Sequence, residues 1–491
     1  METRDADRLA PSAARASRMA MVGVSVAMFC IQVDFFALNL AIPDMARDLD
    51  ATTDSVQWVI SGYMLAVASL FILCGRLGDI YGRRLVLLAG VAIFAASSAL
   101  CAIAPNLATL IAFRVLSGAG AAIIFPVGIA VISNAFDDAR RAWALGLVFG
   151  IANIGTAIGP FLGGGLSQGP GWRWIFWVLV LLSAIAFIIV LLGIRDSRDP
   201  TASRRLDSAG AVLLIAGVAT LSYAVDRGDD WGWGSWRTIG MFVLSAVLLV
   251  AFFLRETRAR NPLIDLSLFH NLPYVLVMSV GAIANVGFTV VIFVVTLYLQ
   301  NVRGLSPLIA GVVFVAPAAM VAFAGPIGAR IKPYFRPTAI MAGAAVLGAA
   351  ATLGATYATS WFAFIPLLAL AGFGFGLGWT FANVATQDVV HPDRAGEASG
   401  VLLTVLVSAG GFGLAAAATA VSSLQQGGTT ANDAYLGTLR VLSLVVFVWA
   451  AAVLAIRAVL VRRGLMAPLN MSASLGATER AVSSRSTAPR G

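Results

Sequence analysis

The chain alternates long apolar runs with short polar gaps. A helix needs about 20 consecutive apolar residues to cross the hydrocarbon core of a membrane, and each run is close to that length, so each predicts one spanning helix. The fourteen predicted spans are residues 19–43, 56–75, 85–104, 107–132, 142–167, 173–194, 209–225, 238–255, 273–300, 307–330, 338–358, 360–388, 396–421 and 438–461. This pattern predicts an all-α polytopic membrane protein.

Composition agrees with a chain embedded in lipid. Of its 491 residues, 59% are hydrophobic and 12% are charged, whereas about a quarter of the residues in a soluble domain are charged. The net charge of +9 does not indicate a nucleic-acid-binding protein, because the basic residues fall in the gaps between apolar runs and not in one stripe. We expect membrane lipids around the chain and no nucleic-acid partner.

Side chains that bind metals are sparse. The three cysteines lie in or at the end of apolar runs without CxxC spacing, and the two histidines, His270 and His391, are far apart in sequence. Protein metal sites need clusters of such ligands. We therefore expect no disulfide framework, no metal and no cofactor.

The distribution of basic residues predicts the orientation of the spans. Cytoplasmic loops carry an excess of Lys and Arg. With the N-terminus inside and the gaps assigned alternately, 26 of the 33 basic residues fall on the cytoplasmic side, six fall outside, and Arg114 lies within a span. Both termini are expected in the cytoplasm, residues 1–18 as a segment that is not cleaved and residues 462–491 as a disordered tail.

Glycine patterns suggest an internal repeat. The segment "GRLGDIYGRR" at 75–84 aligns with "GPIGARIKPYF" at 325–335 at an offset of 250, and "RVLSGAGAA" at 114–122 aligns with "LALAGFGFG" at 368–376 at an offset of 254. Parallel repeats of this kind predict two six-helix bundles related by an axis along the membrane normal.

The repeat predicts the domain organisation. The first bundle is expected at 19–194 and the last at 273–461, and the linker at 195–272 (from about 197 by the repeat) holds two extra central helices. Ala329 stands where Asp79 does and Leu368 where Arg114 does. The charged machinery is therefore expected in the first bundle.

Two charges interrupt apolar runs. Asp34 lies in "CIQVDFFALNLAIP" of the first span and Arg114 lies in the fourth. A charge at the membrane centre costs about 2.5–3.5 kcal/mol, so each should face a cavity or an opposite charge. From the same side of the membrane they lie at depths of about 14 and 11 Å. We predict that they pair; a purely structural salt bridge is the alternative.

A charged, glycine-rich segment joins the second and third spans. Glycine permits tight turns and close helix approach, and acidic and basic side chains can pair across a moving interface. If this segment served only to orient the spans in the membrane, that would explain the arginines but not the acidic residue or the glycine spacing. The candidate gating residues are Gly75, Gly78, Asp79, Gly82, Arg83 and Arg84.

Glycines recur on one face of the fifth span, in "GTAIGPFLGGG" at 155–165. Gly155, Gly159 and Gly163 are four residues apart, which lets a neighbouring helix approach closely. Pro160 favours a kink, and Gly164 extends the glycine run. Ordinary helix packing would explain the glycine spacing by itself.

These motifs, in this order, resemble the major facilitator superfamily, and within it the fourteen-span drug:proton antiporters. The first-span pattern that contributes consists of Asp34, Asn39, Ala41 and Pro43. The resemblance implies that residues 75–84 latch the two bundles on the cytoplasmic side in the outward-facing state. It also implies that the first and fourth spans line a central cavity, and that the fifth-span glycine string is typical of exporters.

The sequence departs from the family in two places. Phe36 stands where the family usually has threonine, and "WRWIFWVLV" at 172–180 lacks the asparagine and proline that commonly follow that aromatic run. Both departures leave the fold unaffected. They prevent a substrate from being inferred from well-studied members.

Other polar residues are weaker candidates. The amides that could line a cavity are Asn153, Asn285, Asn383 and Gln387, although ordinary hydrogen bonding between helices explains each more simply. The segment "DRGDDWGWGSW" at 226–236 is typical of an interfacial aromatic belt. A role for Asp226 in ligand entry is the alternative.

The sequence and the resemblance predict a proton-coupled antiporter, not an enzyme, that exports amphipathic small molecules, cationic ones among them, from a bacterial cytoplasm. Burial disfavours the charge of a carboxylate and a nearby arginine favours it, so Asp34 is suited to carry the proton during alternating access. A dedicated exporter of an endogenous metabolite, siderophore or lipid is one alternative, and an uncoupled facilitator or sensor is another. We expect a monomer.

Overall fold

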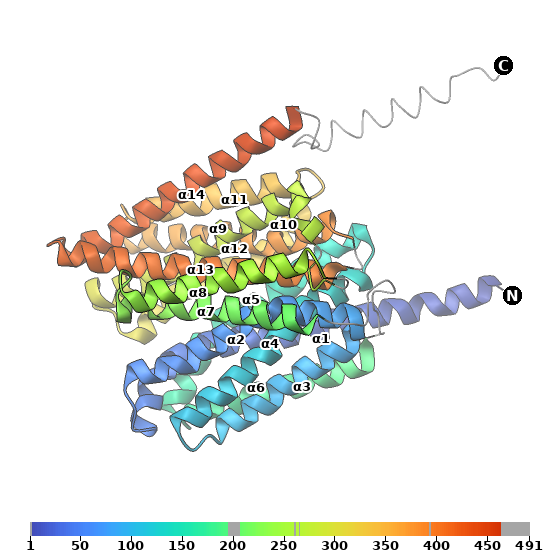
Figure 1. Cartoon of the computed structure of the whole chain (residues 1–491), viewed down its shortest axis with the longest axis horizontal. Helices are drawn as coiled ribbons and strands as arrows, with labels where there is room; N and C mark the ends of the chain where they lie inside the picture. Colours follow the sequence, from blue (N-terminus) through green and yellow to red (C-terminus); the bar gives the residue numbers. More distant parts are fainter. Residues whose placement is uncertain (1, 195–206, 260–261, 265, 392–393, 463–491) are drawn as a thin grey trace.

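The computed structural model describes residues 2–194, 207–259, 262–264, 266–391 and 394–462. These residues form one bundle of long helices that run up and down beside one another (Figure 1). The start of α1 and the end of α14 lie at the same end of the bundle, which we name the terminal side. The other end is named the far side.

The helices fall into two groups of six with a pair between them. The first group is α1 (Glu2–Asp48), α2 (Thr53–Tyr81), α3 (Arg83–Ala102), α4 (Leu107–Ala135), α5 (Asp138–Gln168) and α6 (Arg173–Gly193). The pair is α7 (Ser208–Trp231) and α8 (Trp236–Glu256). The last group is α9 (Leu272–Leu297), α10 (Pro307–Ile331), α11 (Pro337–Ala355), α12 (Trp361–Val389), α13 (Ala395–Gln426) and α14 (Ala431–Arg462), with short helices η1 (Leu266–His270) and η2 (Tyr298–Val302) flanking α9.

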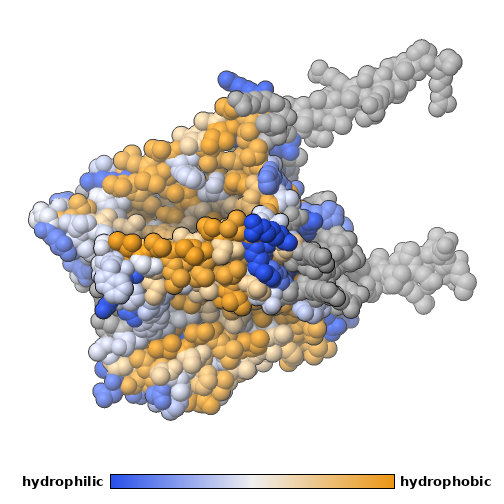
Figure 2. All heavy atoms as spheres, viewed as in Figure 1, coloured by the Kyte–Doolittle hydropathy of each residue, from blue (hydrophilic) through white to orange (hydrophobic). Residues whose placement is uncertain are grey.

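Each of the fourteen predicted spans has its helix. All fourteen α-helices contain a stretch long and apolar enough to cross a membrane. Figure 2 shows hydrophobic residues over the middle of the bundle and hydrophilic residues gathered toward its two ends. A helix satisfies all its backbone hydrogen bonds internally, which lipid demands. The predicted all-α membrane fold is confirmed.

The first helix is longer than predicted at both ends. The predicted span was 19–43, but α1 runs from Glu2 to Asp48, so Pro43 lies inside the helix and does not end it. Proline removes one backbone hydrogen bond, a loss that membrane helices tolerate. The predicted tail at 462–491 lies, beyond Arg462, outside the described residues.

The helices of each six-helix bundle pack in the same way, as the predicted repeat requires. A Cβ added at Gly118 of α4 would lie 2.5 Å from the carbonyl oxygen of Tyr63 on α2, and one added at Gly372 of α12 would lie 2.6 Å from that of Pro317 on α10. Gly118 and Gly372 are 254 residues apart, and so are Tyr63 and Pro317. The internal repeat is therefore a repeat of helix contacts.

The offset between α2 and α10 is also 254, so the predicted offset of 250 for these helices is wrong. A Cβ at Gly400 would lie 2.6 Å from the carbonyl oxygen of Phe71, and one at Gly146 would lie 2.7 Å from that of Gly325. The two offsets differ by four residues, which is about one helical turn. An alignment shifted by this amount still matches glycines on the same helix face, which explains the mistake. Pro333, and not Ala329, stands where Asp79 does.

The two bundles meet toward the terminal side through two pairs of helices, α2 with α13 and α5 with α10. A side chain at Gly75 of α2 would collide with the backbone of Gly396 on α13, and a side chain at Gly325 of α10 would collide with Gly146 on α5. Glycine on both sides of each crossing lets the backbones touch. These crossings bring the two bundles into direct contact.

The α7–α8 pair lies against helices of both bundles. The Ser61 hydroxyl on α2 donates to Asp226 Oδ1 on α7 at 2.7 Å, and the ring of Phe242 on α8 stacks 6.3 Å from that of Phe412 on α13. Arg227 lies over the ring of Trp58 at 4.4 Å. Asp226 is therefore bonded to α2, which the sequence did not predict.

Candidate functional site

Asp34 of α1 and Arg114 of α4 form a buried ion pair. Arg114 Nη1 donates to the two carboxylate oxygens at 2.9 and 2.7 Å, and Arg114 Nε donates to the carbonyl oxygen of Val59 on α2 at 3.0 Å. The side chains of the pair are at most 1% exposed. Two charges that are 80 residues apart in sequence thus compensate each other inside the protein.

Aromatic rings cover the guanidinium group. Its Cζ atom lies 4.2 Å from the ring centroid of Tyr63 on α2 and 5.9 Å from that of Phe176 on α6, positions in which the ring quadrupole attracts a cation. The surrounding helices α1, α2, α4 and α6 all belong to the first bundle. The resemblance implied that the first and fourth spans line a central cavity; in this structure the pair of Asp34 and Arg114 is enclosed by helices of the first bundle.

The glycines of α5 allow α1 to lie directly against it on either side of Asp34. A Cβ at Gly155 would lie 2.8 Å from the carbonyl oxygen of Phe29, and one at Gly159 would lie 2.8 Å from Cβ of Phe36. A side chain at Gly163 would collide with the α1 backbone. The fifth-span glycine face therefore sets the position of the helix that carries the buried carboxylate.

The remaining candidates in the fifth-span glycine string are Gly164 and Pro160. Gly164 is half-buried, and the side chain of Pro160 lies outside the described residues. Beside the glycine face, Gln32 Nε2 donates to Thr156 Oγ1 at 3.1 Å, which adds a polar link between α1 and α5.

Asp79, near the end of α2, joins three helices. Its Oδ1 accepts from Arg83 Nε and Nη2 at 3.1 and 2.8 Å, and its Oδ2 accepts from the backbone N–H of Glu397 at 3.0 Å. Glu397 lies in the first turn of α13, where unpaired N–H groups favour negative charge. One buried carboxylate therefore connects α2 and α3 of the first bundle to α13 of the last.

The glycines of this segment bring its charges into contact. Gly75 faces the backbone of α13, and a Cβ at Gly78 would lie 2.9 Å from the side chain of Val127 on α4. Gly82, between α2 and α3, has a φ of +103°, a conformation that glycine adopts without strain. Arg84 points to another helix and donates to the carbonyl oxygen of Leu191 on α6 at 2.6 Å.

Sequence reasoning missed one ion pair at this interface. Arg76 Nη1 of α2 lies 3.5 Å from Glu397 Oε2 of α13, and Glu397 is 1% exposed. The available signal was that Glu397 is the one acidic residue in the apolar run 396–421. Its partner could not be identified without the tertiary structure, because the two residues are 321 positions apart.

The weaker amide candidates divide into two kinds. Three bond to another helix: Asn153 Oδ1 accepts from Gln32 at 3.4 Å, Asn285 Nδ2 donates to the carbonyl oxygen of Leu406 at 2.7 Å, and Gln387 Nε2 donates to Ser399 Oγ at 2.9 Å. Asn383 differs, because its Nδ2 donates to the carbonyl oxygen of Trp379 in its own helix and its Oδ1 has no hydrogen-bond partner among the described residues.

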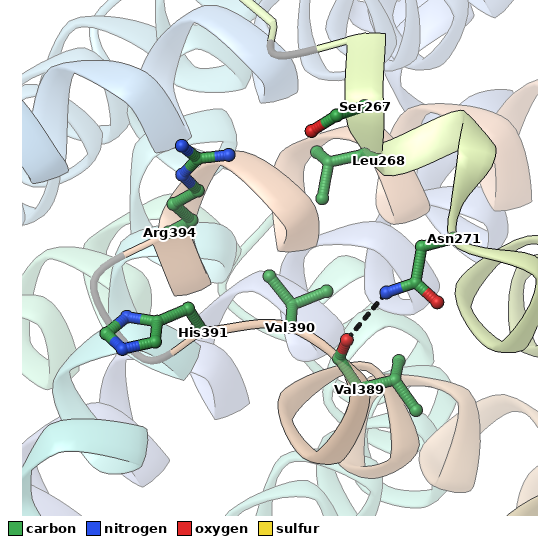
Figure 3. A pocket seen from close by; sticks show the side chains of 7 residues that line it. All are labelled: Ser267, Leu268, Asn271, Val389, Val390, His391 and Arg394. Atoms are coloured by element: carbon green, nitrogen blue, oxygen red, sulfur yellow. Dashed lines mark hydrogen bonds between the residues drawn. The ribbon is translucent and has the colours of Figure 1, made fainter.

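A pocket of about 370 Å³ lies on the terminal side, where η1 and the start of α9 meet the end of α12 and the start of α13 (Figure 3). Asn271 Nδ2 donates to the carbonyl oxygen of Val389 across it at 2.8 Å, and His391 and Arg394 contribute to its lining. Its lining comes only from the last bundle and its linker. We therefore do not place the main functional site there.

The chain matches a family of membrane transporters. Residues 24–415 match the family described as the Major Facilitator Superfamily. The chain therefore belongs to the Major Facilitator Superfamily and is a multi-pass membrane transporter, not an enzyme.

Several relatives are named for resistance or export. The chain is 34% identical over 401 residues to the multidrug resistance protein Stp of Mycobacterium tuberculosis, covering 79% of this chain and 73% of the relative. It is 32% identical to the tetracenomycin C resistance and export protein of Streptomyces glaucescens, covering 78% and 71%. It is 29% identical to the multidrug transporter protein MdtP of Bacillus subtilis, covering 77% and 70%.

A solved structure has the same fold. The chain resembles the human organic anion transporter MFSD10 (TETRAN) with a TM-score of 0.65 at 18% identity, covering 89% of this chain and 99% of the other. At this identity the likeness supports the fold and says nothing of the substrate.

Proposed function

We propose that the chain is a proton-coupled antiporter that exports amphipathic small molecules, cationic ones among them, across the bacterial cytoplasmic membrane. The observation that carries the proposal is the buried pair of Asp34 and Arg114, in which a carboxylate accepts two hydrogen bonds from one arginine. Breaking a buried pair is costly. A proton on Asp34 and the pairing with Arg114 therefore compete.

In the proposed cycle this competition provides the coupling. Asp34 takes up a proton when the protein faces outward, which weakens the pairing with Arg114 and loosens the contact of α1 with α4. Asp34 releases the proton when the protein faces inward and substrate binds. Asp34 lies between α1 residues that touch the α5 glycines, and α5 also contacts α10 of the last bundle, so movement of α1 can reach the interface between the bundles through α5.

The membrane potential can drive such a cycle. A charge that moves down 100 mV yields about 2.3 kcal/mol, which supports a concentration gradient of roughly fifty-fold for one charge per cycle. That gradient is sufficient for export that confers resistance.

The terminal side is proposed to face the cytoplasm, since the alternating assignment of the gaps in the sequence gives 26 of the 33 basic residues to the side of the two termini. The Asp79 and Glu397 contacts would then latch the cytoplasmic side of an outward-facing state. Residues 19–194 and 273–461 would rock against each other about the extra helices of 195–272, within a single chain acting as a monomer.

The names of the relatives support drug export, because multidrug resistance and export occur among them. A dedicated exporter of one endogenous compound is the second candidate. It is favoured by the similarity to a relative named for resistance to, and export of, tetracenomycin C.

The test is proton release from proteoliposomes on addition of lipophilic cations such as ethidium and tetraphenylphosphonium. The native protein is expected to exchange protons for these compounds, and Asp34→Asn is expected to bind them without proton exchange. Asp433→Asn, at an exposed carboxylate in the first turn of α14, serves as the control outside the pair and should exchange normally. Proton exchange that persists in Asp34→Asn would exclude Asp34 as the coupling group.

A further inference from the structure

Trp379 of α12 lies where the last bundle meets the first. Its repeat equivalent, 254 residues earlier, is Phe125 of α4, and the two rings contact each other with centroids 6.5 Å apart and planes at 83°. Two residues that are equivalent in a two-fold repeat can touch only if both lie near the repeat axis. That axis runs between the bundles, where a transporter of this fold opens.

Trp379 is held by phenylalanines of the first bundle. Its ring lies 5.2 Å from that of Phe149 on α5 at 82°, and Phe125 in turn lies 6.3 Å from Phe71 on α2. Edge-to-face pairs of this kind are attractive but weak. Phe71, Phe125 and Phe149 are at most 6% exposed, whereas Trp379 is only partly buried.

A polar stripe continues from Trp379 along α12 toward the terminal side. Asn383 and Thr386 follow it at four and seven positions, which places all three on one helix face. Both polar side chains are completely buried, yet Asn383 Oδ1 and Thr386 Oγ1 have no hydrogen-bond partner among the described residues. Buried polar groups in native proteins are nearly always bonded, so two on one stripe call for an explanation.

The Trp379 end of the stripe faces the first bundle. Ala382 of α12 packs against Gly281 of α9, and Phe381 packs against Gly328 of α10. At about 100° per residue, Phe381 lies on the opposite face of α12 from Asn383, and Ala382 lies to its side. Trp379, on the same face as Asn383, touches Phe125 and Phe149 of the first bundle.

The repeat shows that the stripe belongs to one bundle only. The α4 positions equivalent to Asn383 and Thr386 are Ile129 and Ile132, and both are buried. Helix packing at this position therefore does not require polar side chains. Asn383 and Thr386 leave hydrogen-bonding capacity unused in the closed arrangement, and that capacity becomes available to a ligand when the bundles separate on the terminal side.

We propose that Trp379, Asn383 and Thr386 form the wall of the substrate site contributed by the last bundle, suited to flat aromatic molecules that carry hydrogen-bonding groups. The aromatic part stacks on Trp379 in place of Phe125 or Phe149, and the polar part bonds to Asn383 Oδ1 and Thr386 Oγ1. This assignment rests on the proposed export function and adds its substrate class. It also explains how substrate binding and closure of the terminal side exclude each other, because the ligand and the phenylalanines compete for one indole ring.

Ethidium binding to the protein in nanodiscs, followed by fluorescence titration, tests the assignment. Trp379→Leu and Asn383→Leu are expected to raise the Kd at least ten-fold. The matched controls are Trp361→Leu, at the far-side end of the same helix, and Thr352→Val, a buried hydroxyl that bonds within its own helix at 2.8 Å. Both controls should bind as the native protein does.

Thermal unfolding separates a ligand contact from a packing role. Leucine at position 383 removes a polar oxygen that has no partner, so its unfolding midpoint should equal or exceed the native one while binding falls. A lower midpoint together with lost binding would assign Asn383 to packing and overturn the proposal. Native affinity in both Trp379→Leu and Asn383→Leu, or no saturable ethidium binding by the native protein, would also overturn it.

Proton release tests the export function separately. If ethidium binds in a Trp379-dependent manner but releases no protons from the native protein, coupling fails and the assigned site stands. If protons are released and both α12 variants bind normally, coupling stands and the assigned site fails.

Discussion

At the residue scale, the protein places opposite charges where neither could lie alone. Asp34 and Arg114 are buried together, and the arginine also donates to a backbone carbonyl and lies over the ring of Tyr63. The favourable pair interaction offsets a desolvation cost of several kcal/mol per ion. The pair is therefore stable as a unit, and each member is costly without the other.

Removal of one partner should show this dependence. Arg114→Met is expected to lower the free energy of unfolding by about 3–5 kcal/mol, because Asp34 is left buried without its partner. Adding Asp34→Leu is expected to recover most of the loss, since an apolar pair needs no compensation. Chemical unfolding in detergent measures both. A double variant as unstable as the single one would contradict this account.

At the element scale, backbone contact through glycine sets which helices can approach and how closely. α5 meets α1 through three glycines, and α7 and α8 are tied at their terminal ends by Asp207 and Arg255. The first contact depends on the absence of side chains, and the second depends on charge. They should therefore respond to different changes.

A single methyl group should disturb the α1–α5 contact. Gly163→Ala is expected to cost about 1–3 kcal/mol, because the added Cβ collides with the α1 backbone and a close-packed interface cannot absorb it. Gly165→Ala, two residues along the same helix with nothing within 4 Å, is the matched control and should leave stability unchanged. Equal thermal midpoints for the two variants would exclude a tight α1–α5 contact.

The α7–α8 tie should depend on pH in the acid range. Arg255 donates to Asp207 at 2.7 to 3.0 Å, and these hydrogen bonds hold the pKa of Asp207 below its ordinary value. A carboxyl group whose pKa falls on folding stabilises the protein above its unfolded pKa and loses that contribution as the pH falls through the folded pKa.

Asp207→Asn tests this sign. Arg255 is 47% exposed, so the variant is expected to lose only about 0.5–1 kcal/mol of stability at pH 7. The difference from the native protein should be constant down to about pH 5 and shrink below about pH 4. Unfolding curves measured across this range would refute the assignment if the difference grew as the pH fell.

At the scale of the whole molecule, the two bundles touch through glycine crossings and charges on the terminal side. The α2–α13 crossing adds the carboxylate of Asp79 at the N-terminus of α13 and the pair of Arg76 with Glu397. The α5–α10 crossing is a contact of Gly146 with Gly325. The terminal side can therefore close only if the residues at both crossings have no side chain between the two backbones.

Gly325→Ala should hold the bundles apart on the terminal side. The measurement is the distance between spin labels on Tyr81 of α2 and Tyr334 beyond α10, both exposed and in different bundles. We expect most of the population to shift to longer distances. Gly343→Ala, in α11 with nothing within 4 Å, should keep the native distribution. An unchanged distribution in Gly325→Ala would show that the crossing does not control closure.

The sequence by itself determined the membrane class, the fourteen spans and the repeat, because a helix in lipid must be apolar over a fixed length and a repeat leaves its glycines at matching positions. It also identified Asp34 and Arg114, since a charge is conspicuous in an apolar run, and Asp79 through the glycine-rich motif around it. The sequence predicted the helix ends less well. The apolar pattern predicted that Pro43 ends the first span, but it lies inside α1, because neighbouring groups can satisfy the backbone hydrogen bond that a proline removes.

Only the tertiary structure decided what these residues contact. It enclosed Asp34 and Arg114 within the first bundle, paired Arg76 with Glu397, shifted the α2–α10 offset by four residues, and placed Trp379 against its own repeat equivalent. Each of these facts depends on contacts between residues far apart in sequence. Hydropathy fixes how deep a residue lies in the membrane, but only the packing of helices determines the direction in which it faces.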